Sequence, residues 1–257
     1  MNKIGWCMGI EQAGLLADKG FDYIECPLSS LPIEDERALE EQLPRFLDSP
    51  LRARAMNLFF PPGIMAVGPE ADLDRIRRYV SKAGETASQI GVEIAVLGSG
   101  RARTIPEGWD RRRAEAQMLD LLGIVAEEWR GMGVTMAIEP LNRKESNLIN
   151  SVAEAVLLAK QIESPIVRVL ADFYHMDEEN EPLETIAEHR DWIAHIHVAD
   201  TGRLTPGTGS YPYDRFARIL KEINYKGMIS AECSLLGTDE EMEASLDFMT
   251  RKFGRLE

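Results

Sequence analysis

Short apolar runs alternate with longer amphipathic segments from one end of the chain to the other, and this alternation limits the fold more than any other feature. Eight runs have the length and composition of β-strands: Lys3–Met8, Tyr23–Pro27, Ala53–Phe59, Glu93–Gly98, Thr135–Glu139, Arg168–Asp172, Ala194–Val198 and Met228–Glu232. Helical periodicity lies between them, most clearly in Leu73–Ile90, Arg111–Met132, Val152–Ile162, Tyr213–Ile223 and Asp239–Phe253. Strands joined by helices are predicted to pair in parallel, because a parallel pair needs a crossover connection.

Eight strand-plus-helix units in 257 residues suit a closed (β/α)8 barrel, which takes about 250 residues. The alternative is an open doubly wound sheet, which usually carries a glycine-rich phosphate turn after its first strand. No such turn follows Lys3–Met8. No linker, low-complexity tract or change in composition divides the chain. The sequence therefore predicts one α/β domain over residues 1–257, a single TIM barrel.

An ionisable side chain ends each of the last four predicted strands: Glu139, Asp172, His197 and Glu232. Their spacing is close to the roughly 30 residues of one strand-plus-helix unit. The C-terminal ends of barrel strands open on one face, so we expect the four side chains to converge there. Three carboxylates at one mouth would repel one another without a positive centre, and a divalent cation with oxygen and nitrogen ligands supplies it. Mn²⁺ is the first candidate, with Mg²⁺, Co²⁺ and Zn²⁺ as alternatives.

The residues two positions before these four should form a deeper layer, because side chains alternate between the two faces of a strand. That layer contains Ala137, Leu170 and Ser230, and it contains His195 beneath His197. The pattern predicts ionisable groups at the barrel mouth above a mostly small or apolar floor.

Four short motifs surround the predicted ligands: Glu139–Glu145, Asp172–His175, His195–Asp200 and Ser230–Cys233. In this order and at barrel spacing they resemble the xylose-isomerase-like sugar isomerase/epimerase superfamily. Within it they are most similar to ketose 3-epimerases of the D-tagatose/D-psicose type. The resemblance is close from about Thr135 to Cys233, whereas the N-terminal half shares the strand rhythm and Asn57.

This resemblance implies that Glu139, Asp172, His197 and Glu232 bind one divalent metal ion. It also implies that Glu139 and Glu232 form a catalytic acid/base pair. Inverting a carbon beside a carbonyl requires removal of a proton on one face and its return on the other. The expected reaction is therefore isomerisation or epimerisation of a small ketose through an enediolate, with the metal bound to the carbonyl.

Further positions are expected to contact the substrate. The resemblance assigns this role to Glu145, His175 and Arg203, which can accept from or donate to sugar hydroxyls. Trp6, near the end of the first predicted strand, and Trp109, in the loop after the fourth, are hypothesised to form apolar walls for the sugar.

The loop after the fourth predicted strand departs from the family pattern, because it carries Arg101 and Arg103. One hypothesis is that these arginines bind a carboxylate or phosphate of the substrate, and the alternative is a charged lid loop. Glu25 and Asn57, on the second and third strands, are hypothesised to support the ligands from behind.

Charge and composition limit the partners. The net charge of −14 opposes binding to nucleic acid or to an anionic membrane. The N-terminus lacks the pattern of a signal peptide, and no apolar run is long enough to span a bilayer. The odd number of cysteines, without metal spacing, indicates a reduced cytoplasmic setting. A small sugar or polyol-derived substrate is the expected partner, and a homo-oligomer is consistent with the resemblance.

Other functions remain as alternatives. The same scaffold could act on hydroxypyruvate or an oxo-tetronate, on an inosose, or on an oxidised C-glycoside. An apurinic-site endonuclease would need more than the four histidines present and a basic face for DNA. A non-catalytic sugar- or metal-binding module would keep the pocket but would not exchange a substrate C–H proton.

Overall fold

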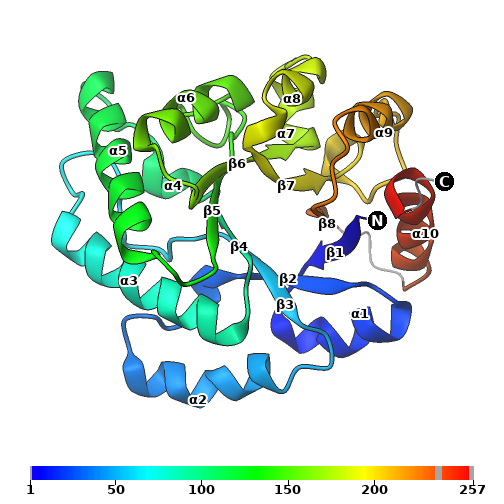
Figure 1. Cartoon of the computed structure of the whole chain (residues 1–257), viewed down its shortest axis with the longest axis horizontal. Coiled ribbons are helices and arrows are strands. Elements are labelled where there is room, and N and C mark those ends of the chain that lie inside the picture. Colours follow the sequence, from blue (N-terminus) through cyan, green and yellow to red (C-terminus); the bar gives the residue numbers. More distant parts are fainter. Residues whose placement is uncertain (1, 235–238, 255–257) are drawn as a thin grey trace.

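The computed structural model describes residues 2–234 and 239–254 of the chain. Within these ranges, eight parallel strands form a closed barrel in sequence order, and β8 pairs with β1 (Figure 1). The strands are β1 (Lys3–Cys7), β2 (Tyr23–Pro27), β3 (Ala53–Asn57), β4 (Ile94–Leu97), β5 (Thr135–Ile138), β6 (Val167–Asp172), β7 (Ile193–Val198) and β8 (Met228–Ala231). The predicted (β/α)8 barrel is confirmed.

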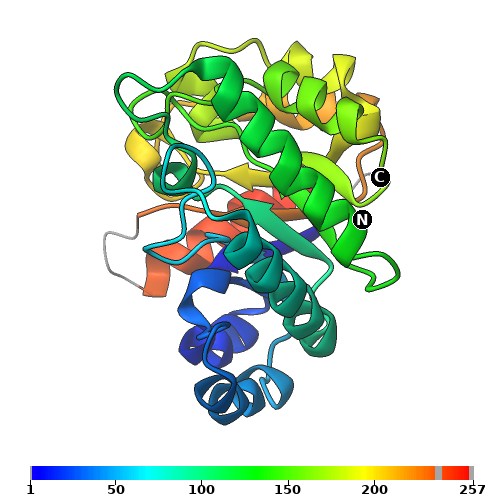
Figure 2. The ribbon, with the colours of Figure 1, turned by 90° about the vertical axis from the view of Figure 1, so that its left-hand side faces the viewer.

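Helices surround the barrel, as two views at right angles show (Figures 1 and 2). They are α1 (Ala13–Lys19), α2 (Glu36–Leu47), α3 (Leu73–Ile90), α4 (Gly100–Arg103), α5 (Arg111–Glu128), α6 (Val152–Ile162), α7 (Phe173–Glu178), α8 (Glu184–Glu188), α9 (Tyr213–Glu222) and α10 (Asp239–Met249). Short turns are η1 (Ile10–Gln12), η2 (Leu28–Ser30), η3 (Arg190–Trp192), η4 (Thr201–Arg203) and η5 (Thr250–Gly254). No helix among the described residues is long and apolar enough to cross a bilayer.

The helix α3 illustrates how sequence determines an element. Its first turn is capped by Asp72, whose carboxylate accepts a hydrogen bond from the backbone N–H of Arg75 at 3.0 Å. It ends at Gly91, which adopts a φ of 90° that a residue with a Cβ rarely adopts. Its buried face, including Ile76, Val80 and Ala83, recurs at helical spacing and packs against the barrel.

Most predicted boundaries lie close to the observed ones, and the differences have local causes. The third strand ends at Asn57 rather than Phe59, because Leu58 turns the chain with a φ of 46°. The helix α5 ends at Glu128, before Trp129, whose indole packs into the core and donates to the carbonyl of Val80 at 2.8 Å.

The barrel has an inner core and an outer core. The inner core contains Tyr23, Ala55, Ile94, Val96, Ala137, Leu170 and Met228. The outer core fills the space between the strands and the helices and is much larger. Ala137 and Leu170 thus lie in the predicted deep layer. This packed floor closes the barrel beneath the strand ends, so the mouth is a site rather than a pore.

Candidate active site

Four ionisable side chains converge where β5 to β8 end. One ligand atom from each of Glu139, Asp172, His197 and Glu232 lies within 4.8 Å of the others. The nearest carboxylate oxygens to His197 Nδ1 are 3.2 Å away on Glu139, 3.7 Å on Glu232 and 3.9 Å on Asp172. Strand register accounts for part of this arrangement, because Asp172 pairs directly with His197 across β6 and β7. The structure therefore brings together all four predicted metal ligands.

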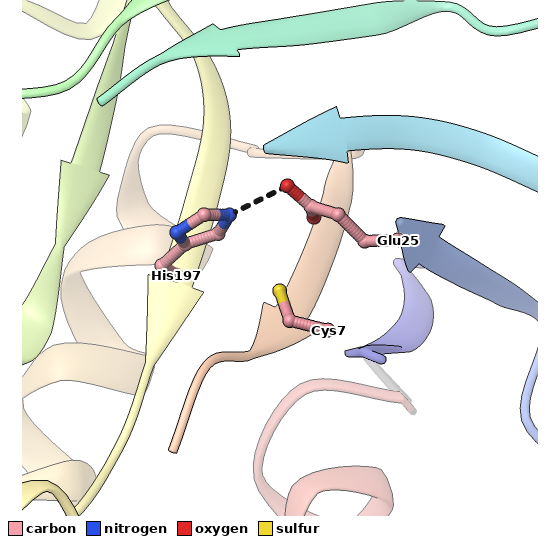
Figure 3. Close-up of side chains that lie close together, drawn as sticks. All are labelled: Cys7, Glu25 and His197. Carbon is pink, nitrogen blue, oxygen red and sulfur yellow. Dashed lines mark hydrogen bonds and ion pairs between the residues drawn. The ribbon is translucent and has the colours of Figure 1, made fainter. Parts of the chain in front are cut away.

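A carboxylate from the other side of the barrel holds His197 in place. Glu25 on β2 is fully buried, and its Oε1 accepts a hydrogen bond from His197 Nε2 at 3.0 Å (Figure 3). Its Oε2 accepts from His195 Nε2 at 2.8 Å and from the hydroxyl of Ser230. Because Nε2 of His197 carries the proton toward Glu25, Nδ1 is the nitrogen that faces the carboxylate cluster. Glu25 thus selects the tautomer of His197.

Cys7 ends β1 beside Glu25 and His197 (Figure 3). Burial raises the pKa of the Cys7 thiol well above its usual value, and the charge of Glu25 raises it further. The thiol is therefore protonated and forms a small neutral part of the wall. Cys7, Cys26 and Cys233 are all free.

Glu139 lies one residue beyond β5, and two neighbours fix its position. A Cβ atom at Gly98 would lie 2.0 Å from Glu139 Oε2, so only glycine leaves room for this carboxylate. Arg103 is 1% exposed, and its Nη2 donates to the backbone carbonyl of Glu139. The Nε and Nη1 atoms of Arg103 have no hydrogen-bond partner. Arg103 therefore supports the backbone that carries Glu139.

Asp172 is oriented by the helix that follows it. Its Oδ1 accepts hydrogen bonds from the backbone N–H groups of Tyr174 at 2.7 Å and His175 at 3.3 Å, at the start of α7. These bonds leave Oδ2 facing His197. The helix cap thus presents one oxygen of Asp172 to the cluster.

Glu232 is held by a neutral and a charged donor. Asn57, at the end of β3, donates from Nδ2 to Glu232 Oε1 at 2.7 Å. Arg203 donates from Nη2 to Glu232 Oε2 at 2.7 Å and from Nη1 to Glu145 Oε1 at 2.9 Å. Arg203 also lies over the ring of Tyr174, 4.9 Å from its centroid. The guanidinium thus links the rim residue Glu145 to the cluster.

His175 presents an unused donor beside the cluster. Its Nδ1 accepts hydrogen bonds from the backbone N–H of Asn142 at 3.2 Å and from the Asn142 amide group at 2.9 Å. The proton therefore resides on Nε2, which is buried and lies 3.9 Å from Asp172 Oδ2. This nitrogen has no hydrogen-bond partner among the residues that the structure describes. Asn142 also donates to Glu145 at 3.2 Å, so it joins two predicted substrate contacts.

Burial and mutual repulsion shift the pKa values of the three carboxylates in the cluster. Burial raises the pKa of Glu139, and the neighbouring charge of Glu232 raises it further. Burial likewise raises the pKa of Asp172 to about 6. Burial opposes ionisation of Glu232 too, but His197 and Arg203 outweigh it and lower its pKa to about 2. Buried carboxylates that resist ionisation together are stabilised by a positive centre.

The donor set fits a divalent metal ion. Three carboxylates and one imidazole nitrogen supply hard oxygen ligands and one borderline nitrogen, which suits Mn²⁺, Mg²⁺ or Co²⁺. Although burial lowers the pKa of His197, Glu25 and Glu232 outweigh this effect and raise it well above its usual value. A proton on Nδ1 therefore occupies the position that a cation would take.

The two predicted tryptophan walls are not at the cluster. Side-chain alternation turns Trp6 outward from β1, where it is 1% exposed and packs edge-to-face on Phe21 at 5.5 Å, so the predicted sugar contact is wrong. Trp109 stacks under Arg113 at 4.2 Å and donates to Gln117 at 3.2 Å. Both partners lie on α5, so these contacts hold the Trp109 ring against that helix.

The two loop arginines have different positions. Arg103 is buried and donates to the backbone carbonyl of Glu139, so it is not a surface ligand for a substrate phosphate. Arg101 is exposed and lies on the edge of a cavity of about 330 Å³. Sequence patterns could not separate the two, because the distinction depends on which side of a short helix, α4, faces β5.

Comparisons with known proteins agree with the fold and the motifs. A family model described as xylose isomerase-like TIM barrel matches residues 13–252. The D-psicose 3-epimerase of Enterocloster bolteae is 28% identical over 222 residues, which are 81% of this chain and 71% of that protein. The 3-dehydro-D-guloside 4-epimerase of Escherichia coli is 30% identical over 172 residues, or 65% of each protein. A crystal structure of 3-keto-D-glucoside 4-epimerase from E. coli superimposes with a TM-score of 0.82 at 19% identity, covering 98% of this chain and all of that one.

Proposed function

The chain belongs to the xylose isomerase-like TIM barrel family, and we propose that it is a divalent-metal-dependent epimerase or isomerase of a small ketose. The convergence of Glu139, Asp172, His197 and Glu232 within 4.8 Å carries this proposal. The similarity to the D-psicose 3-epimerase of E. bolteae and the 3-dehydro-D-guloside 4-epimerase of E. coli supports sugar epimerisation as the reaction class.

We propose that the four residues hold one metal ion, with Mn²⁺ preferred. When bound, such an ion polarises the carbonyl and the adjacent hydroxyl of a sugar. It thereby acidifies the C–H bond on the carbon that carries this hydroxyl. Its two positive charges would offset two of the three negative charges and so reduce the repulsion that keeps Glu139 and Asp172 hard to ionise.

Glu139 and Glu232 then act as the acid/base pair. They come from β5 and β8, so they approach a sugar at the mouth from two sides. One carboxylate removes the proton from the carbon beside the carbonyl, and the other returns a proton to the opposite face of the enediolate. Asn57 and Arg203 donate to Glu232, and Gly98 leaves room for Glu139, so each carboxylate has a defined position.

The remaining polar groups position the sugar. His175 donates from its free Nε2 to a substrate oxygen, which satisfies a buried donor that has no other partner. Arg203 and Glu145 bind hydroxyls at the rim, where their mutual ion pair leaves other donors and acceptors available. The exposed position of Glu145 places it at the entrance rather than the reacting carbon.

Deuterium incorporation from D₂O tests this proposal across a panel of ketoses, because proton exchange reports the activated carbon whatever the product. With Mn²⁺ present, at least one ketose should gain one deuterium beside its carbonyl, and a chelator should abolish the exchange. Full exchange by protein verified to be metal-free would contradict the metal requirement. Absence of exchange from every ketose, inosose and small keto-acid would contradict the reaction class.

A further inference from the structure

A cavity of about 330 Å³ opens between the loops that follow β3 and β4. Its walls are mostly apolar and include Leu58, Phe60, Pro61, Pro62, Ile64 and Met65. The only charged side chain among its lining residues is Arg101. This volume is at the lower end of the range for small-molecule sites, and sugars with only hydroxyl groups do not need such a wall. We refer to it as the β3–β4 pocket.

The loops that form the β3–β4 pocket directly follow residues that contact the proposed acid/base pair. Leu58 directly follows Asn57, which donates to Glu232 at 2.7 Å. On the other wall, Ser99 follows Gly98, whose Cα faces the carboxylate of Glu139. Both walls therefore start one residue from groups that touch the two proposed catalytic glutamates.

The two walls are tied together, so the β3–β4 pocket is preformed. The hydroxyl of Ser99 accepts a hydrogen bond from the backbone N–H of Phe60 at 2.8 Å. The carbonyl of Ala102 accepts from the N–H of Ala66 at 2.7 Å, and the carbonyl of Leu58 accepts from the N–H of Ser29 at 3.0 Å. A pocket built in this way loses little conformational entropy when a ligand enters it.

Leu58 shows two features that packing within the described residues does not explain. Its side chain is 46% exposed, and few other large apolar side chains among the described residues are exposed. Its φ of 46° lies in the left-handed region, which β-carbon-bearing residues rarely adopt. An exposed leucine held in a strained conformation beside a catalytic site indicates a binding role.

We propose that the β3–β4 pocket binds an aromatic substituent on the substrate, so that the preferred substrate is an aryl glycoside of a keto-sugar. This inference rests on the proposed function, because the sugar carbonyl must lie at the metal site. The flat faces of Pro61 and Pro62 and the guanidinium of Arg101 suit stacking on an aromatic ring. The 30% identity to an E. coli enzyme named 3-dehydro-D-guloside 4-epimerase supports a substrate with a glycosidic substituent.

The test compares phenyl and methyl 3-dehydro-β-D-glucopyranoside, which differ only in the substituent. Deuterium exchange in D₂O with Mn²⁺ gives kcat/KM for each. Burial of one phenyl ring should make the phenyl glycoside better by about tenfold or more. Leu58→Asn should lower this phenyl-to-methyl ratio by about threefold or more, because it removes an apolar wall while asparagine tolerates the same φ.

Leu47→Asn is the matched control, because Leu47 is 49% exposed on α2 and does not line the β3–β4 pocket. This variant should leave the ratio unchanged. Equal kcat/KM for the two glycosides, or exchange of free ketoses only, would overturn the aryl pocket and leave the proposed function intact. A phenyl preference that Leu58→Asn does not alter would also overturn it. Absence of exchange from glycosides and ketoses alike would overturn both proposals.

Discussion

The two halves of the barrel contribute differently to the mouth. The second half, β5 to β8, supplies the four candidate ligands, which converge there. The first half orients or makes room for them: Glu25 fixes His197, Asn57 holds Glu232, and Gly98 leaves space for Glu139. Arg203 and the start of α7 add positioning groups from the second half. The proposed chemistry therefore belongs to one half, whereas the positioning of its groups depends on both. Substitutions in the two halves should therefore fail in different ways.

The largest effect is expected in the second half. Glu139→Gln and Glu232→Gln each keep the size of the side chain but remove its basicity, so each should lower turnover by about 10²- to 10⁴-fold. Sugar binding should survive, as measured by titration calorimetry with a ketose. Wild-type turnover in either variant would remove that glutamate from the acid/base pair.

The next largest effect is expected from a steric change in the first half of the barrel. Gly98→Ala places a methyl group where Glu139 Oε2 lies, so the carboxylate must move and turnover should fall by about 100-fold. Gly123→Ala in α5 is the control, because a Cβ at that position meets nothing within 4 Å. Equal activity of the two variants would show that the position of Glu139 is not critical.

Glu25→Gln tests whether Glu25 orients His197 for metal binding without being a metal ligand itself. The variant keeps an acceptor for one histidine but loses the carboxylate that holds His197 and His195, so Mn²⁺ affinity should fall by about 10- to 100-fold. Saturating Mn²⁺ should then restore most of the turnover, which it should not do for Glu139→Gln. Unchanged affinity, measured by Mn²⁺ titration, would show that Glu25 serves only the core.

The fold was largely predictable from sequence because its signals are local. Strand and helix periodicity identified the barrel without any knowledge of contacts. The convergence of the four candidate ligands was also predictable, because an ionisable residue that ends an apolar strand is unusual in itself. Trp6 was misplaced because a single residue at a strand end gives no signal of which face it takes. The roles of Gly98 and Arg103 depend on contacts across neighbouring strands, which sequence spacing does not reveal.

The effect of pH on stability and Mn²⁺ affinity, which acts through Asp172 in the second half, should be smaller than the effects of these substitutions. Asp172 has a pKa of about 6 in the folded chain against an ordinary value of 3.8, so its protonated form favours the folded state. In metal-free protein this contribution is present at low pH and is lost as pH rises through about 6. Mn²⁺ affinity should change in the opposite sense and weaken as pH falls below about 6, because the ligands must lose their protons.

Asp172→Asn is expected to have the smallest effect. It directly checks the sign of the contribution that Asp172 makes to stability. Asparagine can still cap α7, while the buried charge is removed. In the presence of a chelator at pH 7.5, the variant should therefore be more stable than wild type by about 2 kcal/mol, or roughly 4–8 °C in Tm. At pH 5 the difference should shrink, because Asp172 is then protonated in wild type. A lower Tm at both pH values, by calorimetry, would contradict the inferred repulsion.

The most direct measurement is a Mn²⁺ titration followed by electron paramagnetic resonance, with wild type and the His197→Ala variant compared at pH 7.5. The account predicts one tight Mn²⁺ per wild-type chain and no tight site in the variant, with deuterium exchange into the sugar rising in proportion to bound Mn²⁺. Tight binding that survives loss of His197, or exchange at full rate without bound metal, would contradict it.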